Sequence, residues 1–192
     1  EGSAIGMAIG NFLSTKKPSA VYLQNSGLGN IVNPLTSLAS EKVFSIPVLL
    51  IIGWRGEPDN KDEPQHDFQG EITLEQLKLL KIDYIILDTN DDINFQEVKT
   101  TLDNKKSIAL IIKKNYFKKD KRQFNNNDNE LSRVEVIKFL LEKYDKDTIF
   151  VSTTGKTSRE LYELNKIYNR KAFYCIGGMG HASSVAAGIA IN

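Results

Sequence analysis

Apolar residues follow two different spacings along this chain. Residues 46–52 are apolar without a break, which is typical of a parallel strand buried on both faces. Residues 131–144 instead carry apolar residues at helical spacing. The stripe predicted on that helix consists of Val134, Ile137, Leu140, Leu141 and Tyr144.

The two spacings alternate from one end of the chain to the other. Such an order predicts an α/β fold, with parallel sheets covered by helices on both faces. Predicted helices cover residues 3–13, 31–40, 73–80, 94–103, 131–144 and 158–168, and predicted strands cover residues 20–23, 46–52, 84–87, 107–112, 148–151 and 172–175.

Two polar segments interrupt this alternation. Residues 53–70 are rich in charge and are predicted to form a long loop. Residues 118–130, which include Asn125-Asn126-Asn127, are predicted to be a linker. The chain is therefore expected to hold one partial α/β unit at 1–117 and a second at 131–192, each with a parallel sheet flanked by helices.

The composition points to a globular protein without an obvious polyionic partner. The 192 residues are 41% hydrophobic and 26% charged, and 25 basic against 24 acidic residues leave a net charge of +1. This balance favours neither nucleic acid nor a membrane as the partner. The longest apolar run, 46–52, is too short to span a bilayer. A single cysteine, Cys175, excludes an internal disulfide, and a cytoplasmic location is expected.

Both ends of the chain lie inside a structural pattern. The chain opens on Glu1-Gly2-Ser3-Ala4, already within a helical spacing, and it stops just after the apolar run 185–191. We therefore expect this chain to be a piece of a longer protein.

Glycine and small polar residues gather in four loops that follow predicted strands. Ligands of open α/β sheets bind beyond the carboxyl ends of the strands, and glycine lets backbone amides approach a phosphate. One such loop is explained well enough as a tight connection, but four together favour a phosphate-bearing ligand. The loops lie at 24–30, 53–70, 152–157 and 177–181.

The turn 153–157, Thr-Thr-Gly-Lys-Thr, is similar to a nucleotide-binding P-loop but lacks its first glycine. That glycine belongs five residues before the glycine of the Gly-Lys pair, where this chain has Phe150. A P-loop is therefore excluded. A looser phosphate-binding turn and simple capping of the next helix both remain open.

Single residues remain ambiguous when taken by themselves. Glu1 is a surface carboxylate by default, and a loop histidine such as His66 is more often solvated than catalytic. His181 follows a glycine-rich turn, where a structural role at the helix start competes with a ligand contact. Met179 stands between glycines that give it no packing partner.

Several motifs taken together resemble the thiamine-diphosphate-dependent 2-oxoacid decarboxylases, and more narrowly the branch that acts on phosphonopyruvate. Glu1-Gly2-Ser3-Ala4-Ile5-Gly6 resembles the glutamate-bearing helix start of the pyrimidine-binding domain in that family. The narrower resemblance rests on residues 24–30, 53–58 and 62–66, and residues 152–161 and 178–183 are similar to the start of the diphosphate-binding domain.

The resemblance implies a role for each matching position. Glu1 would hold a proton on the aminopyrimidine ring of thiamine diphosphate, and His66 would move protons or hold the substrate carboxylate. Positions expected to bind cofactor are Glu1, Gly27, Leu28, Gly29, Thr154, Gly155, Met179 and Gly180. Positions expected to bind substrate are Arg55, Lys61, Gln65 and His66, of which Arg55 or Lys61 would pair with the phosphonate.

The resemblance also implies an assembly and a metal. Family members are dimers or larger homo-oligomers that hold the cofactor between the pyrimidine-binding domain of one subunit and the diphosphate-binding domain of another. The family's Gly-Asp-Gly motif and downstream Asn, which bind Mg²⁺, are missing here, so the metal ligands are expected outside this chain. This piece alone is expected to be inactive, whereas its parent would convert phosphonopyruvate to phosphonoacetaldehyde and carbon dioxide.

Two alternatives remain open from the sequence. Sulfopyruvate decarboxylase is a near relative that has a sulfonate substrate in place of the phosphonate. A non-catalytic α/β module that binds a phosphate ligand or a partner subunit belongs to a different functional class.

Overall fold

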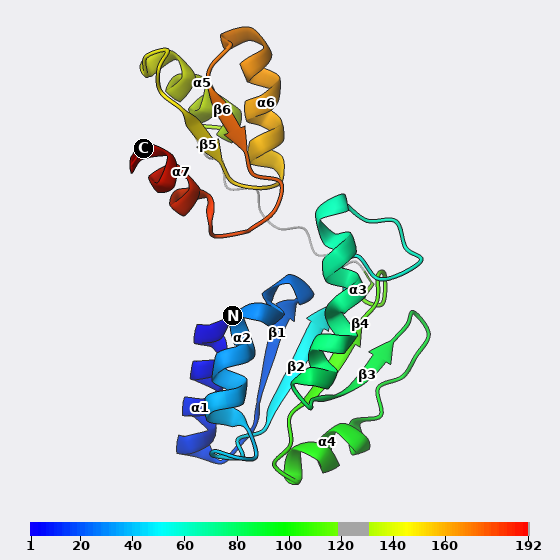
Figure 1. The fold of residues 1–192 in the computed structure, drawn as a ribbon. Helices are drawn as coiled ribbons and strands as arrows, with labels where there is room; N and C mark the ends of the chain where they lie inside the picture. The colour runs from blue at the N-terminus through cyan, green and yellow to red at the C-terminus, as the bar shows by residue number, and fades with distance from the viewer. Residues whose placement is uncertain (119–130, 192) are drawn as a thin grey trace. The chain divides into compact units, whose positions relative to one another are not determined.

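The computed structural model describes residues 1–118 and 131–191. The chain divides into two compact units, Glu1–Lys121 and Arg122–Asn192 (Figure 1). Apart from Lys118, the predicted linker at 118–130 lies outside the described residues. No helix in the described ranges is long and apolar enough to cross a membrane.

Unit 1 is built around a parallel sheet of four strands in the order β1-β2-β4-β3, which confirms the predicted α/β class. Its strands are β1 (Ser19–Gln24), β2 (Val48–Gly53), β3 (Asp83–Leu87) and β4 (Ile108–Ile112). Its helical elements are α1 (Gly2–Thr15), η1 (Asn25–Gly27), α2 (Leu28–Pro34), η2 (Leu35–Ala39), α3 (Pro64–Leu79) and α4 (Phe95–Asp103).

The helices cover the two faces of this sheet unequally. Helices α1, α2 and α3 pack on one face, where the alternate residues Val48, Leu50 and Ile52 of β2 are fully buried. Helix α4 covers the other face around β3 and β4. On that second face Tyr22 of β1 remains 72% exposed, so α4 leaves this edge of the sheet uncovered.

Helix α3 begins at Pro64, so the prediction of a loop from residue 53 to residue 70 is wrong in its second half. Glu63 is extended and Pro64 occupies the first turn, a position in which the missing N–H of proline has no helical partner to lose. The polar residues in the first two turns do not show an apolar helical stripe. Only Gly70, Thr73 and Leu77 of α3 are buried.

A close crossing of two backbones fixes α3 against the loop after β2. A Cβ added to Gly70 would lie 1.6 Å from the carbonyl oxygen of Gly56, and one added to Gly56 would lie 2.0 Å from the carbonyl oxygen of His66. Trp54 Nε1 donates a hydrogen bond to the Gly70 carbonyl, 3.0 Å away. Only glycine at both positions lets the first turns of α3 approach so closely.

Unit 2 has a smaller sheet of β5 (Phe150–Ser152) and β6 (Ala172–Tyr174), which are parallel. Its helices are α5 (Arg133–Lys143), α6 (Lys156–Tyr168) and α7 (Ala182–Ile191). Of the predicted stripe on α5, Ile137 and Leu141 are buried, whereas Val134, Leu140 and Tyr144 are exposed, so the stripe is narrower than predicted.

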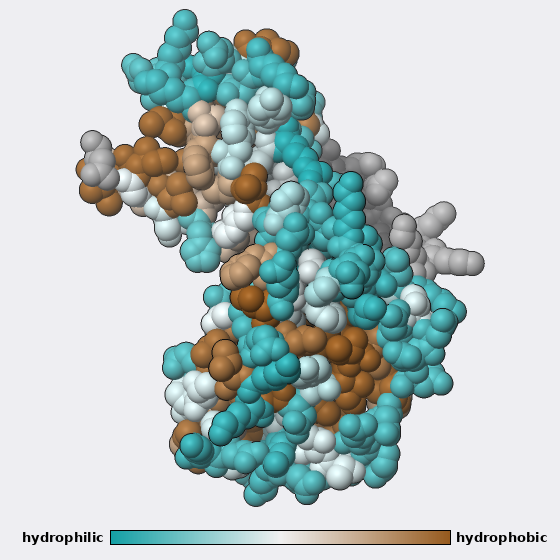
Figure 2. All heavy atoms as spheres, turned by 45° about the vertical axis from the view of Figure 1, so that its right-hand side comes forward, coloured by the Kyte–Doolittle hydropathy of each residue, from teal (hydrophilic) through white to brown (hydrophobic). Residues whose placement is uncertain are grey.

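Helix α7 is apolar yet buries none of its residues. Figure 2 shows its side chains as apolar surface, with Ile191 83% exposed. In the described part of unit 2, the buried core cluster is small and comprises Ile137, Leu141 and Leu161, with five partly buried residues packed against it. This unit therefore leaves much apolar surface in solvent.

Candidate active site

The Glu1 side chain lies directly against Gly27, where α1 and α2 begin. A Cβ at residue 27 would stand 2.6 Å from Glu1 Cγ and 2.7 Å from Glu1 Oε1. Asn30 Nδ2 donates a hydrogen bond to Glu1 Oε2 at 2.9 Å, whereas Oε1 has no hydrogen-bond partner in the described part of the chain. The carboxylate is thus held on one side and free to accept on the other.

The loop from Gln24 to Asn30 is helical from its second residue onward. Gly27 ends η1, and Leu28 starts α2 with its side chain fully buried in the core. Leu28 can therefore offer only its backbone to a ligand. Gly29 is exposed, and a side chain there would meet open space.

Asn25 fastens this loop to the loop that follows β2. Its side chain is fully buried, and its Nδ2 donates to the Arg55 carbonyl at 2.8 Å and to Thr73 Oγ1 at 2.9 Å. The Arg55 amide donates in return to Asn25 Oδ1 at 3.1 Å. Asn25 carries no signal of its own in the sequence, although it lies in the motif 24–30.

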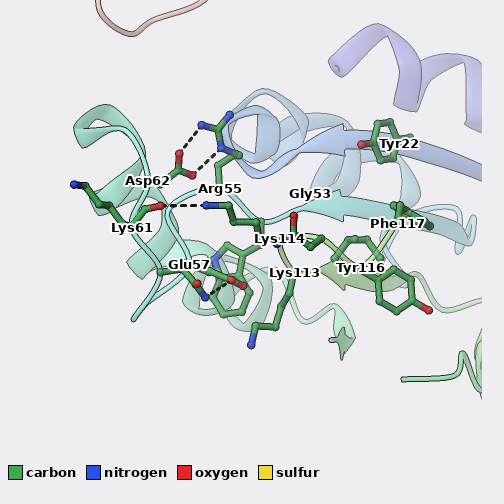
Figure 3. A pocket seen from close by; sticks show the side chains of 14 residues that line it. Tyr22, Gly53, Arg55, Glu57, Lys61, Asp62, Lys113, Lys114, Tyr116 and Phe117 are labelled. Carbon is green, nitrogen blue, oxygen red and sulfur yellow. Dashed lines mark hydrogen bonds and ion pairs between the residues drawn. The ribbon is translucent and has the colours of Figure 1, made fainter. Parts of the chain in front are cut away.

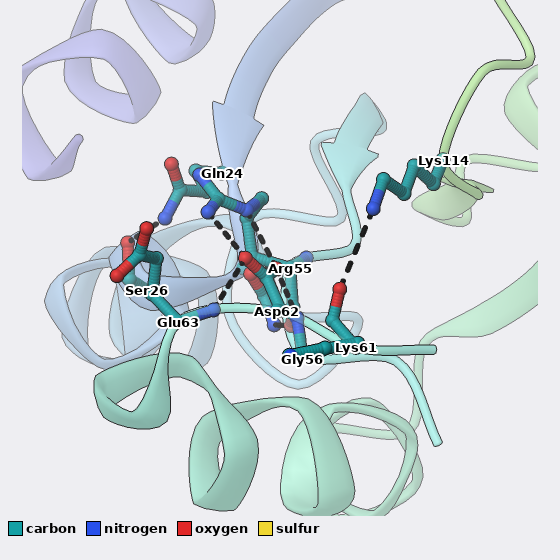
Figure 4. Close-up of polar contacts among 9 residues, drawn as sticks. Gln24, Ser26, Arg55, Gly56, Lys61, Asp62, Glu63 and Lys114 are labelled. Carbon is teal, nitrogen blue, oxygen red and sulfur yellow. Dashed lines mark hydrogen bonds and ion pairs between the residues drawn. The ribbon is translucent and has the colours of Figure 1, made fainter. Parts of the chain in front are cut away.

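Arg55 and Asp62 form a two-pronged ion pair (Figure 4). Arg55 Nε lies 2.7 Å from Asp62 Oδ2, and Arg55 Nη2 lies 2.5 Å from Asp62 Oδ1. The backbone amides of Gly56 and Glu63 also donate to this carboxylate. The hydrogen bonds from Arg55, followed by those amides, hold the pKa of Asp62 far below its usual range. The pair closes the loop 55–62 onto itself.

Gln65 and His66 occupy the first turn of α3 and not a loop. Gln65 is exposed and His66 is half-buried, with the His66 amide donating to the Glu63 carbonyl at 2.8 Å. Burial lowers the pKa of the His66 imidazole below its usual value, and the positive charge of Arg55 lowers it further. Both causes favour the neutral imidazole.

A cleft of about 390 Å³ opens at the carboxyl ends of β2 and β4 (Figure 3). The predicted residues Arg55 and Lys61 line it. It is also lined by Glu57, Lys113 and Lys114, which were not predicted as site residues. Lys113 and Lys114 directly follow β4, and the loop after this strand is not rich in glycine. Lys113 Nζ pairs with Asp88 Oδ2 at 2.6 Å, and Lys114 Nζ donates to the Lys61 carbonyl at 3.4 Å.

In unit 2 the two predicted loops meet at the carboxyl ends of β5 and β6. Thr154 Oγ1 donates to the Ile176 carbonyl at 2.8 Å. The hydroxyl oxygens of Ser152 and Ser158 lie 2.7 Å apart, and Ser158 Oγ also donates to the Cys175 carbonyl at 3.1 Å. This network of buried hydroxyls joins the turn before α6 to the turn before α7.

Gly155, Met179 and Gly180 lie on the open side of these turns. Gly155 has φ of 84° and Gly180 has φ of 87°, and a Cβ at either would meet nothing within 4 Å. Met179 is 60% exposed. His181 Nδ1 lies 3.0 Å from the Met179 carbonyl, which ties the histidine to its own turn.

Residues 1–118 and 131–191 contain no group of three or more His, Cys, Asp or Glu side chains placed to hold a metal ion. Each unit nevertheless brings its predicted residues to the carboxyl edge of its own sheet. In unit 1 these are Glu1 beside Gly27, and Arg55 and Lys61 around one cleft. In unit 2 Thr154 is tied to the segment that leads to Met179.

Residues 1–79 match the family described as thiamine pyrophosphate enzyme, N-terminal TPP binding domain. The chain is 32% identical over 212 aligned residues to phosphonopyruvate decarboxylase of Streptomyces viridochromogenes, covering 100% of this chain and 52% of that protein. It is 32% identical over 125 residues to the alpha subunit of sulfopyruvate decarboxylase of Methanococcus maripaludis, covering 63% of this chain and 72% of the subunit. The beta subunit from that organism is 43% identical over 63 residues, covering 33% of this chain and 32% of the subunit.

The fold and these matches define the class as a thiamine pyrophosphate (thiamine diphosphate) enzyme of the α/β type. The chain belongs to the family of thiamine-diphosphate-dependent decarboxylases that contains phosphonopyruvate decarboxylase and sulfopyruvate decarboxylase, which confirms the resemblance seen in the motifs. It spans about half the length, 52%, of the phosphonopyruvate decarboxylase it matches. The sulfopyruvate relatives are named as subunits and are therefore parts of an assembly.

Proposed function

We propose that the complete protein containing this chain decarboxylates phosphonopyruvate to phosphonoacetaldehyde and carbon dioxide, with thiamine diphosphate and Mg²⁺ as cofactors. The observation that carries the proposal is the Glu1 carboxylate held against Gly27 at the start of α1. It lies within the segment that matches the thiamine pyrophosphate binding domain.

Glu1 fits the role of the carboxylate that faces the aminopyrimidine ring. Asn30 orients it through Oε2, and Oε1 is left without a hydrogen-bond partner in the described part of the chain. A carboxylate placed in this way shares a proton with a ring nitrogen and so favours the reactive tautomer of the ring. Thiamine diphosphate, when bound, supplies the electron sink that accepts the electron pair left as carbon dioxide departs.

In the proposed assignment, unit 2 binds the diphosphate end of the cofactor. Thr154 and Gly155 form an open backbone turn at the start of α6, and a helix start favours phosphate. The Thr154 hydroxyl already donates to the Ile176 carbonyl and would have to turn to donate to the diphosphate. Met179 and Gly180 would contact the cofactor from the turn before α7. The Mg²⁺ ligands are expected outside this chain.

The substrate would bind along the loop after β2 and the first turn of α3. His66, whose pKa is lowered by burial and by Arg55, suits a group that accepts a proton or donates a hydrogen bond to the substrate carboxylate. Gln65 is exposed beside it. Arg55 and Lys61 are the proposed partners of the phosphonate, although Asp62 already engages two of the Arg55 N–H groups.

The domain assignment and the assembly belong to the same proposal. Residues 1–117 would be the pyrimidine-binding domain without its N-terminal part, residues 118–130 the linker, and residues 131–192 the start of the diphosphate-binding domain. In support, this chain is similar both to the alpha subunit and to the separate beta subunit of sulfopyruvate decarboxylase of Methanococcus maripaludis. A homo-oligomer, dimeric or larger, would hold the cofactor between subunits in the cytoplasm.

The activity is tested by measuring carbon dioxide release by the complete protein from phosphonopyruvate and from sulfopyruvate, with and without thiamine diphosphate and Mg²⁺. We expect cofactor-dependent release that is faster with phosphonopyruvate, because similarity to that enzyme extends over the whole chain. Release from sulfopyruvate alone would favour the second candidate, sulfopyruvate decarboxylase. Release from neither would reject the class of reaction.

The assembly is tested by light scattering on the active complete protein. A shared cofactor site requires a dimer or a larger oligomer at the concentration used for the activity assay. A monomer that still turns over substrate would contradict the shared site, because no second chain would then be present to supply Glu1.

A further inference from the structure

Glu57 is a buried carboxylate in the wall of the cleft at the ends of β2 and β4. It is 4% exposed, and Figure 3 shows it beside Lys113 and Lys114. Its Oε1 accepts a hydrogen bond from Asn60 Nδ2. Its Oε2 is buried and has no hydrogen-bond partner in residues 1–118 or 131–191.

A buried carboxylate oxygen without a donor is unfavourable, because desolvation of the charge is not offset. Burial accordingly raises the pKa of Glu57, and Asp88 adds to this shift, whereas the charge of Lys113 and the nearby backbone amide of Lys114 oppose it. The free energy improves when a donor or a shared proton reaches the carboxylate. A ligand for this cleft should therefore bring a group that donates a hydrogen bond.

Some cationic side chains of the same cleft already form ion pairs with carboxylates, and others do not. Arg55 is paired with Asp62 and Lys113 with Asp88. Lys61 and Lys114 form no ion pair in the described part of the chain, and Lys114 Nζ contacts only a backbone carbonyl at 3.4 Å. The cleft thus combines available positive charge with one carboxylate oxygen, Glu57 Oε2, that has no hydrogen-bond donor in the described part of the chain.

A phosphonate satisfies both conditions and a sulfonate does not. The second ionisation of a phosphoryl group lies near neutral pH, about 6 for phosphate esters, so such a group can share a proton with a carboxylate and still carry negative charge for lysine. A sulfonate has lost its only acidic proton at that pH. Its oxygens can accept hydrogen bonds but cannot donate one to Glu57.

We propose that Glu57 shares a proton with the phosphonate of the substrate, whose remaining negative charge Lys114 would balance, and thereby selects phosphonate over sulfonate. This inference rests on the proposed function and adds a specificity residue to it. A site built around a hydrogen bond rejects the analogue that lacks the donor. One hydrogen bond to a charged group corresponds to about 10- to 100-fold in affinity, which sets the expected size of the discrimination.

The main test compares Glu57→Gln with the wild-type complete protein on phosphonopyruvate and sulfopyruvate. The Gln amide can donate to a sulfonate, so kcat/KM for sulfopyruvate should rise relative to that for phosphonopyruvate, narrowing the ratio at least about tenfold. The control is Glu71→Gln, an exposed carboxylate on α3, which should leave the ratio unchanged. An equal loss for both substrates in Glu57→Gln would overturn the proposal, since structural damage alone does not change a ratio.

A second measurement needs neither turnover nor a variant. Methylphosphonate and methanesulfonate are titrated into the complete protein while the backbone amide signals of Glu57 and Lys114 are followed by NMR. Tighter binding of methylphosphonate, by at least about tenfold, supports the site even if neither 2-oxoacid is decarboxylated. Equal binding of both anions, or binding of neither, overturns it even if phosphonopyruvate is a substrate.

Discussion

Glu1 and Gly27 are in such close contact that any side chain at residue 27 would displace the carboxylate. The nearest atoms to a Cβ at that position are Glu1 Cγ at 2.6 Å and Glu1 Oε1 at 2.7 Å. Both atoms belong to a flexible side chain, so a Cβ at residue 27 would push the carboxylate aside and leave the backbone in place. Gly27 is therefore a positioning residue for Glu1.

We expect Gly27→Ala to fold normally and to lose activity. A displacement of about 1 Å at a reacting group can reduce the rate by about a hundredfold. Gly10→Ala is the control, since a Cβ there meets nothing within 4 Å and Ala in a helix is more stable than Gly by about 0.5–1 kcal/mol. Steady-state turnover and thermal unfolding of both variants check this. Unchanged turnover in Gly27→Ala would show that the contact has no catalytic role.

The crossing of Gly56 and Gly70 predicts a stability effect and not a local catalytic one. In Gly70→Ala the added Cβ would stand 1.6 Å from a backbone oxygen, which cannot move away as a side chain can. Overpacking of this kind typically destabilises by about 1–3 kcal/mol, sometimes more. Denaturant unfolding should show a lower midpoint than in the wild type, with Gly10→Ala again as the control. A midpoint within error of the wild type would mean that the backbones at Gly56 and Gly70 are not in such close contact.

His66 should titrate below its usual value of 6.5. Burial is the main cause and Arg55 adds to it, so Arg55→Gln should move the midpoint upward. The unfolded chain then binds the proton first, so the stabilisation linked to neutral His66 is complete above pH 6.5 and is lost as the pH falls toward the folded pKa. NMR titration of the imidazole measures both midpoints. A wild-type midpoint at or above 6.5 would contradict the burial of this side chain.

The strands of both units could be predicted from local sequence. A strand that is buried in a parallel sheet must be apolar along its length, as in Val48–Gly53 and Ile108–Ile112. The local pattern missed the start of α3, where Pro64 and the Gly56–Gly70 crossing decide the structure although the local composition is charged. The crossing depends on residues distant in sequence, and no local spacing reveals such a contact.

The candidate site was predictable only where a motif carried it. Glu1 and Gly27 were found through the family resemblance, and their contact follows from the packing of α1 on α2. Glu57 and Asn25 gave no separate signal, because an acidic or amide residue in a polar loop is exposed by default. Their burial depends on the loop after β2 closing through Arg55 and Asp62.

The proposed chemistry requires that the Glu1 carboxylate activates the cofactor. The most direct test measures turnover of phosphonopyruvate by the complete protein and by its Glu1→Gln variant, together with thiamine diphosphate binding by each. The amide keeps the size of the side chain but cannot share the proton, so turnover should fall at least about a hundredfold while the cofactor still binds. Near-normal turnover in Glu1→Gln would show that Glu1 is not the carboxylate that activates the cofactor.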